Sequence, residues 1–280
     1  MLTKLPNSQM WSAVGEVLII GVSKPIHQGV ARLMVDDSNP VSEAAKDFQC
    51  PLILSPHAPG GVEGLPSVVD NAVFAGRLCY DSFHKPNKAT AERADYLYNI
   101  AEQNHLSVLE HMHFSVLFTN VSRSFTHELV RHRHFSFSQE SQRYVVQKPF
   151  IVVPPNASEA EAELLADQAQ KAYETYLDMV KTGLSEGELT RKQVLEKARA
   201  LLPSCFATRI VVSGNLRSWV EFFQKRDSEF ADAEMRAMAG QTSFEFYKYF
   251  THNDPGGVNL SRMLGLISGE VEQQGPKVGA

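Results

Sequence analysis

A long helical pattern over residues 158–182 sets the strongest limit on how this chain can fold. Apolar side chains recur there at helical spacing and form one stripe, at Leu164, Ala169, Ala172, Tyr173, Tyr176, Leu177 and Val180. Gly183 is expected to close the helix, because glycine readily adopts the left-handed conformation at a helix end. Long helices are therefore a major part of the predicted fold.

Strand candidates are few, and helices separate them. The strands are predicted at residues 17–22, 114–121, 150–153 and 209–213. Further helices are predicted over residues 89–102, from Ser122 or Ser124 towards His134, over 191–202 before Pro203, and over 216–249 with a break near Gly240. The chain has no regular βαβ rhythm. This favours an α+β fold, a mixed β-sheet flanked by long helices, over a doubly wound parallel sheet.

Composition excludes several classes of protein. Hydrophobic residues make up 43% of the 280 residues and charged residues 21%, as in ordinary globular proteins and unlike disordered chains. The formal net charge of −5 argues against broad binding to a nucleic-acid backbone. The 3 cysteines lack CxxC spacing, so neither a disulfide framework nor a zinc ribbon is predicted.

Three features of the sequence predict the cellular location of the protein. Glu16 interrupts the short apolar run near the N-terminus, so this segment does not resemble a secretory signal. No stretch approaches the roughly 18 to 20 apolar residues that span a bilayer. The odd number of cysteines favours a reducing compartment. We therefore expect a cytoplasmic protein that binds neither membranes nor nucleic acid.

Residues 105–144 hold the densest set of chemically active side chains, including histidines at 105, 111, 113, 127, 132 and 134. Arg131 and Arg133 lie about 200° apart on the predicted helix, so they are not both expected to face solvent. A partly buried arginine needs an anionic or acceptor-rich partner. Residues 135–144 are predicted to form a polar loop with many short donors. The segment predicts a site for an anionic, base-containing small molecule; a solvated basic helix is the alternative.

Two other chemistries fit this segment less well. His127 and His132 are five residues apart, about 140° around a helix, whereas a pair of zinc ligands on one helix is four apart. No metal is therefore predicted. Ser141 lacks GxSxG context, and Cys205 is interpreted as a small buried side chain. Neither is predicted to act as a covalent nucleophile.

The sequence RHRHFSFSQESQRY, residues 131–144, closely resembles the signature of the flavin-dependent thymidylate synthases, in particular the actinobacterial ones. Its core is Arg131-His132-Arg133, followed after seven residues by Ser141. Other blocks resemble segments of the same family in the same order, at residues 76–87, 105–111, 199–219 and 225–236. The resemblance covers roughly residues 70–240.

Domain organisation follows from the same resemblance. Length alone allows about two domains or one large one. The resemblance predicts a catalytic domain at residues 66–252. Residues 1–65 match the family weakly and are either part of this domain or peripheral to it, and residues 253–280 are expected to be a loose C-terminal tail.

The resemblance implies the reductive methylation of dUMP to dTMP. In this family methylenetetrahydrofolate supplies the carbon, and NADPH supplies the reducing equivalents through FAD. The resemblance also implies a homotetramer with shared active sites. Because the flavin carries the hydride chemistry, the protein mainly binds and orients. The alternatives are a noncatalytic nucleotide- or flavin-binding protein on the same scaffold, or a metallohydrolase.

The family pattern assigns residues to both ligands. FAD is expected to be bound by Ser107, Arg131, His132, Arg133, Gln139, Asn215, Leu216, Arg217 and Glu221. dUMP is expected to be bound by Glu128, Leu129, Val130, Arg131, Gln139, Glu140, Ser141, Gln142, Arg143, Arg199 and Arg226. Ser141 is predicted to donate a hydrogen bond to the substrate. Arg226 is predicted to activate the pyrimidine by stabilising negative charge at N3 and the carbonyl oxygens.

Three positions depart from the pattern of some relatives. Glu128 stands where some carry Gln, Glu221 where some carry Asn, and Phe230 where a His is common. The missing His puts in question a hydrogen bond to the cofactor or to neighbouring residues. Phe230 is expected to stack or pack instead.

Overall fold

The computed structural model describes residues 2–5, 9–23, 68–80, 82, 90, 92–253 and 258–268, so most of the weakly matched region at 1–65 lies outside the described residues. The chain divides into two compact units. The first contains Met1–Ile20, Ser115–Ser213 and Phe222–Thr242, and the second contains Gly21–Phe114, Gly214–Glu221 and Ser243–Ala280. Each unit is described by itself below.

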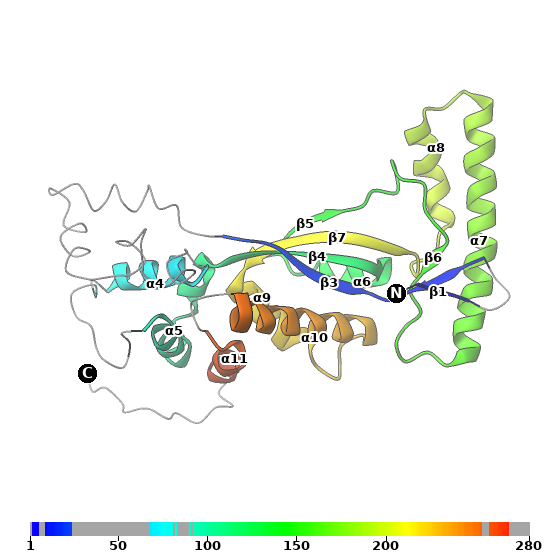
Figure 1. Ribbon diagram of the computed structural model, residues 1–280. Coiled ribbons are helices and arrows are strands. Elements are labelled where there is room, and N and C mark those ends of the chain that lie inside the picture. Colours follow the sequence, from blue (N-terminus) through cyan, green and yellow to red (C-terminus); the bar gives the residue numbers. More distant parts are fainter. Residues whose placement is uncertain are drawn as a thin grey trace. The chain divides into compact units, whose positions relative to one another are not determined.

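Two β-sheets are built largely from the first unit (Figure 1). The four-stranded sheet has the order β3 (Glu16–Val22), β4 (His113–Ser122), β7 (Ala207–Asn215) and β5 (Ser136–Gln139). β5 and β7 are antiparallel. The three-stranded sheet has the order β1 (Leu2–Lys4), β2 (Trp11–Ala13) and β6 (Phe150–Ile151). It is mixed, because β1 is antiparallel to β2 and β6 is parallel to it.

Alternating side chains on β4 give the four-stranded sheet one covered face. Val116 and Phe118 are fully buried on that face, whereas Ser115 and Thr119 on the other are partly exposed. The ring of Phe118 packs on that of Phe125, with centroids 5.4 Å apart. The helices beside this sheet are α6 (Arg123–Leu129), the end of α9 (Leu216–Arg226) and α10 (Ala233–Lys248). The sheets and flanking helices confirm the predicted α+β class.

A helical hairpin completes the first unit. α7 (Glu159–Glu186) begins at a capping box of Ser158 with Glu161, and α8 (Arg191–Ala198) begins at one of Thr190 with Gln193. A short 3-10 turn, η3 (Arg199–Leu201), follows α8.

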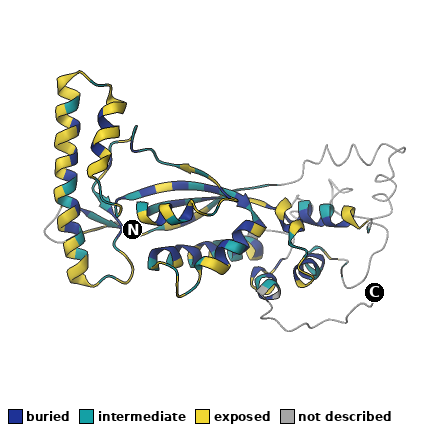
Figure 2. Cartoon of the chain, turned by 180° about the vertical axis from the view of Figure 1, so that it is seen from behind, coloured by how far each residue is buried: buried dark blue, intermediate teal, exposed yellow. Residues whose placement is uncertain are grey.

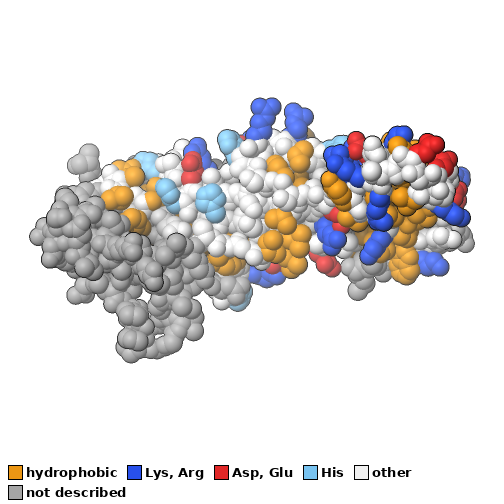
Figure 3. Space-filling view, turned by 90° about the horizontal axis from the view of Figure 1, so that it is seen from above, with side chains coloured by type: hydrophobic (Ala, Val, Ile, Leu, Met, Phe, Trp, Pro, Cys, Tyr) orange, Lys and Arg blue, Asp and Glu red, His pale blue; other side chains and the backbone are white. Residues whose placement is uncertain are grey.

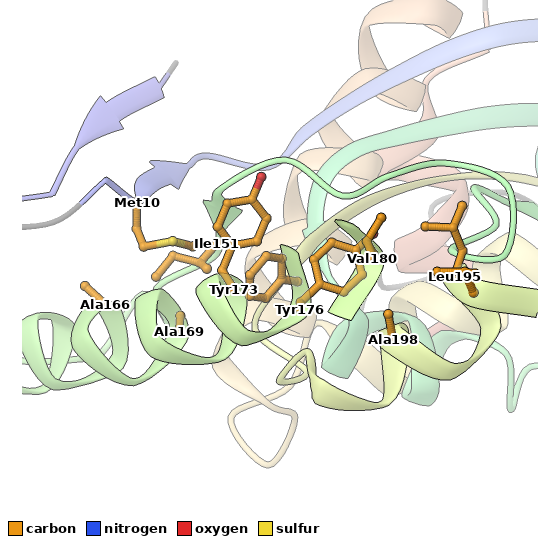
Figure 4. Close-up of a cluster of buried hydrophobic side chains, with 11 residues drawn as sticks. Met10, Ile151, Ala166, Ala169, Tyr173, Tyr176, Val180, Leu195 and Ala198 are labelled. Carbon is orange, nitrogen blue, oxygen red and sulfur yellow. The ribbon is translucent and has the colours of Figure 1, made fainter. Parts of the chain in front are cut away.

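The buried side chains of the hairpin form one cluster with Ile151 of β6 and with Met10 and Phe206, which precede β2 and β7 (Figure 4). Its members are Met10, Ile151, Ala166, Ala169, Tyr173, Tyr176, Val180, Val194, Leu195, Ala198 and Phe206. The backbone of Gln147 is fixed at its edge: its N–H donates to the Tyr176 hydroxyl over 3.1 Å, and its carbonyl accepts from the Tyr173 hydroxyl over 3.1 Å. The cluster therefore anchors the segment that leads into β6.

Two expectations about α7 are wrong. Gly183 lies inside the helix, where an added Cβ would be 3.0 Å from Val194, so this glycine lets α8 approach closely. The helix ends at Gly187, whose φ of 70° is left-handed. The apolar stripe is also narrower than predicted, because Leu164 and Leu177 are 61% and 38% exposed on a helix that is exposed along most of its length (Figure 2).

The helix expected over residues 216–249 is divided elsewhere than predicted. Residues 227–232 separate α9 from α10, and Gly240 lies inside α10. The Asp232 carboxylate accepts from the N–H of Glu234 over 3.0 Å and of Met235 over 3.3 Å. An aspartate cap at the start of α10 thus sets this boundary.

The second unit is mostly helical. Its elements include α4 (Val68–Cys79), α5 (Arg93–Glu102), the 3-10 turn η2 (Leu106–His111), the π-helix η4 (Tyr249–Asn253) and α11 (Leu260–Ser268). The buried Asp70 pairs with Arg93 over 2.9 Å. α11 lies in the segment expected to be a loose tail, and Arg262 packs over the ring of Tyr98 at 4.2 Å. Within the described ranges, no helix combines the length and apolar character needed to cross a bilayer.

Candidate functional site

A buried carboxylate fixes the start of α6. The Ser122 hydroxyl caps this helix by accepting from the N–H of Phe125 over 2.9 Å. The Ser122 N–H and hydroxyl in turn donate to the two carboxylate oxygens of Glu234, over 2.8 and 2.5 Å. Burial raises the pKa of Glu234 above its usual value, and the Ser122 hydrogen bonds oppose that shift. The first turn of α6 is thereby tied to the first turn of α10.

The turn after α6 carries the Arg-His-Arg core. The helix was expected to run towards His134, but it ends at Leu129, and the next residues form turns. Arg131 and Arg133 are both exposed, so the expectation that they do not both face solvent is wrong; it assumed a helix that does not extend this far. Neither arginine has an ion pair with any residue the structure describes. The guanidinium groups of Arg131 and Arg133 are therefore available to bind an anionic ligand.

Arg226, at the end of α9, is held by two side chains from α6 and its following turn. Its terminal nitrogen NH1 lies 3.0 Å from a Glu128 carboxylate oxygen, and its Nε donates to His132 Nε2 over 2.9 Å. In this hydrogen bond the guanidinium N–H donates and His132 Nε2 accepts. The Arg226 side chain is 23% exposed, and its NH2 group has no partner among the described residues. Two nitrogens of the Arg226 guanidinium are therefore held in place, and the NH2 group has no partner among the described residues.

The loop after β5 is braced from two sides. Residues 136–139 were expected to lie in a polar loop, but they form β5 because they pair with β7. The Gln139 amide donates to the Thr126 hydroxyl over 3.1 Å. The Glu140 carbonyl accepts from Arg123 over 2.9 Å, and its carboxylate lies 2.7 Å from Arg209. These contacts fix the backbone immediately before Ser141.

Among the described residues, no side chain that could act as a catalytic base contacts Ser141. Its hydroxyl accepts from the backbone N–H of Arg143 over 3.3 Å, and within the described part of the chain no side chain bonds to it. Arg143 reaches Glu196 of α8 through two nitrogens, at 3.0 and 3.1 Å. Gln142 is 8% exposed and turns inward, donating to Gln147 over 3.5 Å. Ser141 is therefore placed as a donor or acceptor and not as an activated nucleophile.

Positive charge gathers around this loop. Arg123 is partly buried, and burial is the main cause that lowers its pKa; Glu140 opposes the shift, and nearby Arg199 adds to it. Arg199 itself is exposed. Sequence reasoning did not select Arg123, although it lies in the basic stretch around the signature. On the face shown in Figure 3, Lys and Arg side chains are interspersed with acidic and hydrophobic ones.

The apolar residues Leu129, Val130 and Phe230 differ in how far they are exposed to solvent. Leu129 is fully buried, so only its main chain can reach a ligand, whereas Val130 is 42% exposed. Phe230 is 92% exposed in the segment between α9 and α10. Phe230 therefore packs on no part of the described chain and presents its ring to solvent.

The residues expected to bind FAD are divided between the two units. Arg131, His132, Arg133 and Gln139 belong to the first, and Ser107, Asn215, Leu216, Arg217 and Glu221 belong to the second. In the second unit, the Asn215 amide oxygen accepts from the N–H and hydroxyl of Ser218, both over 2.9 Å, and so caps α9. Arg217 pairs with Glu110 over 2.6 Å while 51% exposed.

In each unit, taken by itself, the residues expected to bind FAD offer donors that suit an anionic dinucleotide. Arg131 and Arg133 are exposed and unpaired among the described residues, and Ser107 is exposed. Guanidinium groups suit a pyrophosphate, and the Asn215 amide nitrogen remains able to donate. Leu216 is fully buried and contributes packing.

Metal binding and thiolate catalysis are alternatives that the described residues do not support. In the described ranges, no three His, Cys, Asp or Glu side chains lie close enough together to hold a metal ion. Burial raises the pKa of the Cys205 thiol to about 11. A thiol with so high a pKa is a poor nucleophile near neutral pH.

Comparison with known proteins identifies similar sequences. The family described as "Thymidylate synthase complementing protein" matches residues 65–250. A protein of Mycobacterium bovis named "Flavin-dependent thymidylate synthase" is 46% identical over 186 residues, which cover 63% of this chain and 73% of the relative. Proteins of the same name from Mycobacterium sp. (strain JLS) and Mycolicibacterium gilvum are 48% identical over 179 residues and 47% identical over 175 residues. Each of these two matches covers 59% of this chain and 70% of the relative.

Proposed function

The chain belongs to the thymidylate synthase complementing protein family, and on that premise we propose that it is a flavin-dependent thymidylate synthase, a methyltransferase. It converts dUMP to dTMP with methylenetetrahydrofolate as the carbon donor and NADPH, through FAD, as the reductant. The family match over residues 65–250, which includes the whole Arg-His-Arg to Ser141 signature, carries this conclusion.

The dUMP site that we propose lies in the first unit, which contains every residue expected to bind this substrate. Arg143, Arg199 and the missed Arg123 are suited to the phosphate, because guanidinium groups pair with phosphate oxygens. Ser141 donates a hydrogen bond to the substrate. Glu128 and the backbone of residues 129–130 border the base.

FAD, when bound, supplies the hydride chemistry of the reaction. We assign its phosphates to Arg131 and Arg133, whose side chains are exposed and without an ion-pair partner in the described ranges. Ser107, Asn215 and Arg217 provide further hydroxyl, amide and guanidinium donors, and Glu221 provides an acceptor. The role of these residues is to bind and orient the cofactor.

Arg226 is the residue that activates the pyrimidine. Glu128 and His132 fix two of its nitrogens, and its open edge is left for the base. A fixed guanidinium stabilises negative charge at N3 and the carbonyl oxygens without having to reorganise during the reaction. Electron density then accumulates at C5, where the new carbon is attached. No covalent enzyme nucleophile is required.

We also propose a homotetramer with shared active sites that works in the cytoplasm. Hybrids of an Arg199→Ala chain with a Ser141→Ala chain should then recover part of the activity that each variant lacks. A strictly monomeric but fully active protein would refute the shared site.

The decisive experiment is an anaerobic assay of dTMP formation from dUMP, methylenetetrahydrofolate and NADPH. A flavin-dependent synthase requires all three and FAD. A noncatalytic flavin-binding relative of the same scaffold would bind FAD yet form no dTMP. Metal analysis of the purified protein tests the metallohydrolase alternative.

A further inference from the structure

A pocket of about 200 Å³ lies in the first unit and is lined by the end of β4, the start of β7, Glu140 and the segment that leads into β6. Among the residues expected to bind dUMP or FAD, only Glu140 lines it. Its polar lining includes Thr119, Asn120, Glu140, Lys148, Thr208 and Arg209. The pocket is therefore separate from the site proposed above, apart from this one shared residue.

The end of β4 forms one wall because its backbone changes conformation there. Asn120 has a φ of 55°, in the left-handed region that non-glycine residues rarely occupy. The alternation of buried and exposed side chains stops at this residue, and Val121 and Ser122 are both buried. Thr119 and Asn120 are consequently both left partly exposed beside the pocket.

Several polar groups of the lining have no hydrogen-bond partner among the described residues. Thr208 is only 5% exposed, and its hydroxyl has no hydrogen-bond partner among the described residues. A buried hydroxyl without a partner is unfavourable, so a ligand that bonds to it is favoured. Within the same described residues, the Asn120 amide and the Lys148 ammonium group also have no side-chain or main-chain partner. These groups can donate to the oxygens of a ligand.

The charges of the lining leave one excess cation. Glu140 and Arg209 pair over 2.7 Å and largely neutralise each other. Lys148 is exposed and forms no ion pair with any residue that the structure describes. The rest of the lining includes the apolar residues Val145, Val146, Phe150 and Ala207. A ligand with a negative head and a small apolar body matches both parts.

We propose that this pocket binds a small organic anion, with its carboxylate or phosphate group on Lys148 and its apolar part against Val145 and Phe150. The volume sets the size, because about 200 Å³ is below the range of roughly 300–1,000 Å³ that holds drug-sized ligands.

Calorimetric titration of the full chain with benzoate tests this site. Benzyl alcohol, which has the ring without the charge, and inorganic phosphate, which has the charge without the ring, serve as comparison probes. Benzoate should bind saturably and more tightly than either. Lys148→Met should weaken benzoate binding about tenfold, the effect of losing one charged hydrogen bond. Thr208→Val, which keeps the side-chain shape, should weaken it by a smaller factor.

The control is Lys181→Met, which changes an exposed lysine on α7 outside the pocket and should leave benzoate binding unchanged. Hydrogen exchange should show benzoate protecting residues 119–120 and 145–148. Equal affinity for benzoate and benzyl alcohol, unchanged binding by Lys148→Met, or protection elsewhere would overturn the proposal. These readouts do not depend on dTMP formation, so this site and the proposed activity can fail separately.

Discussion

Replacing Arg226 by Ala should separate activity from stability. Arg226 contacts Glu128 over 3.0 Å and His132 over 2.9 Å, and these are its only hydrogen bonds to described residues. If this guanidinium stabilises the charge that develops on the pyrimidine, its loss should reduce dTMP formation about 100-fold to 1000-fold, as for other preorganised donors. That corresponds to about 2.7–4 kcal/mol of transition-state stabilisation.

The effect on folding should be much smaller. The two side chains of the ion pair are 23% and 43% exposed, for Arg226 and Glu128 respectively, so solvent screens their attraction. Pairs of this kind contribute about 0–1 kcal/mol to stability. After the substitution Glu128 remains solvated, and His132 loses one donor. The free energy of unfolding should therefore fall by no more than about 1 kcal/mol.

The assay compares single-turnover dTMP formation with urea unfolding for three variants. Arg226→Lys should restore little activity, because a point charge cannot span two positions of the base edge. Arg236→Ala, an exposed arginine of α10, is the matched control and should change neither quantity appreciably. Near-normal dTMP formation by Arg226→Ala would assign pyrimidine activation to another arginine. A collapse in stability would instead show that Arg226 is mainly structural.

Other substitutions test the remaining assignments. Ser141→Ala should slow turnover yet leave measurable dTMP formation, because no described residue lies where it could act as a base for Ser141; isolation of a covalent adduct on Ser141 would contradict this. Arg217→Ala should weaken FAD binding in a fluorescence titration, and unchanged affinity would remove Arg217 from the cofactor site. Glu234→Gln tests the buried carboxyl, whose pKa is raised by burial. A raised folded-state pKa gives stability that is present below the ordinary value of 4.5 and is lost as pH rises through the folded-state pKa. Urea unfolding should thus show wild type losing stability relative to Glu234→Gln as pH rises, and a difference independent of pH would refute this reading.

The sequence by itself determined the features that depend on near neighbours. The caps at Ser158 and Thr190 are local, since each side chain bonds to the backbone three residues on. The strand at 114–121 follows from alternation, and the family signature is a contiguous string. Fold class and family therefore follow from the amino-acid order alone, because short-range spacing carries both kinds of information.

Only the tertiary structure decided what depends on packing between distant segments. Arg226 bonds to His132 and Glu128, which are 94 and 98 residues away in the chain. The end of α6 at Leu129 could not be predicted from the sequence either, and it leaves Arg131 and Arg133 exposed. Gly183 is a residue type common at helix ends, yet it serves as a contact for α8. Contacts between residues far apart in the chain depend on how helices and strands pack against one another, and no local sequence pattern encodes that packing.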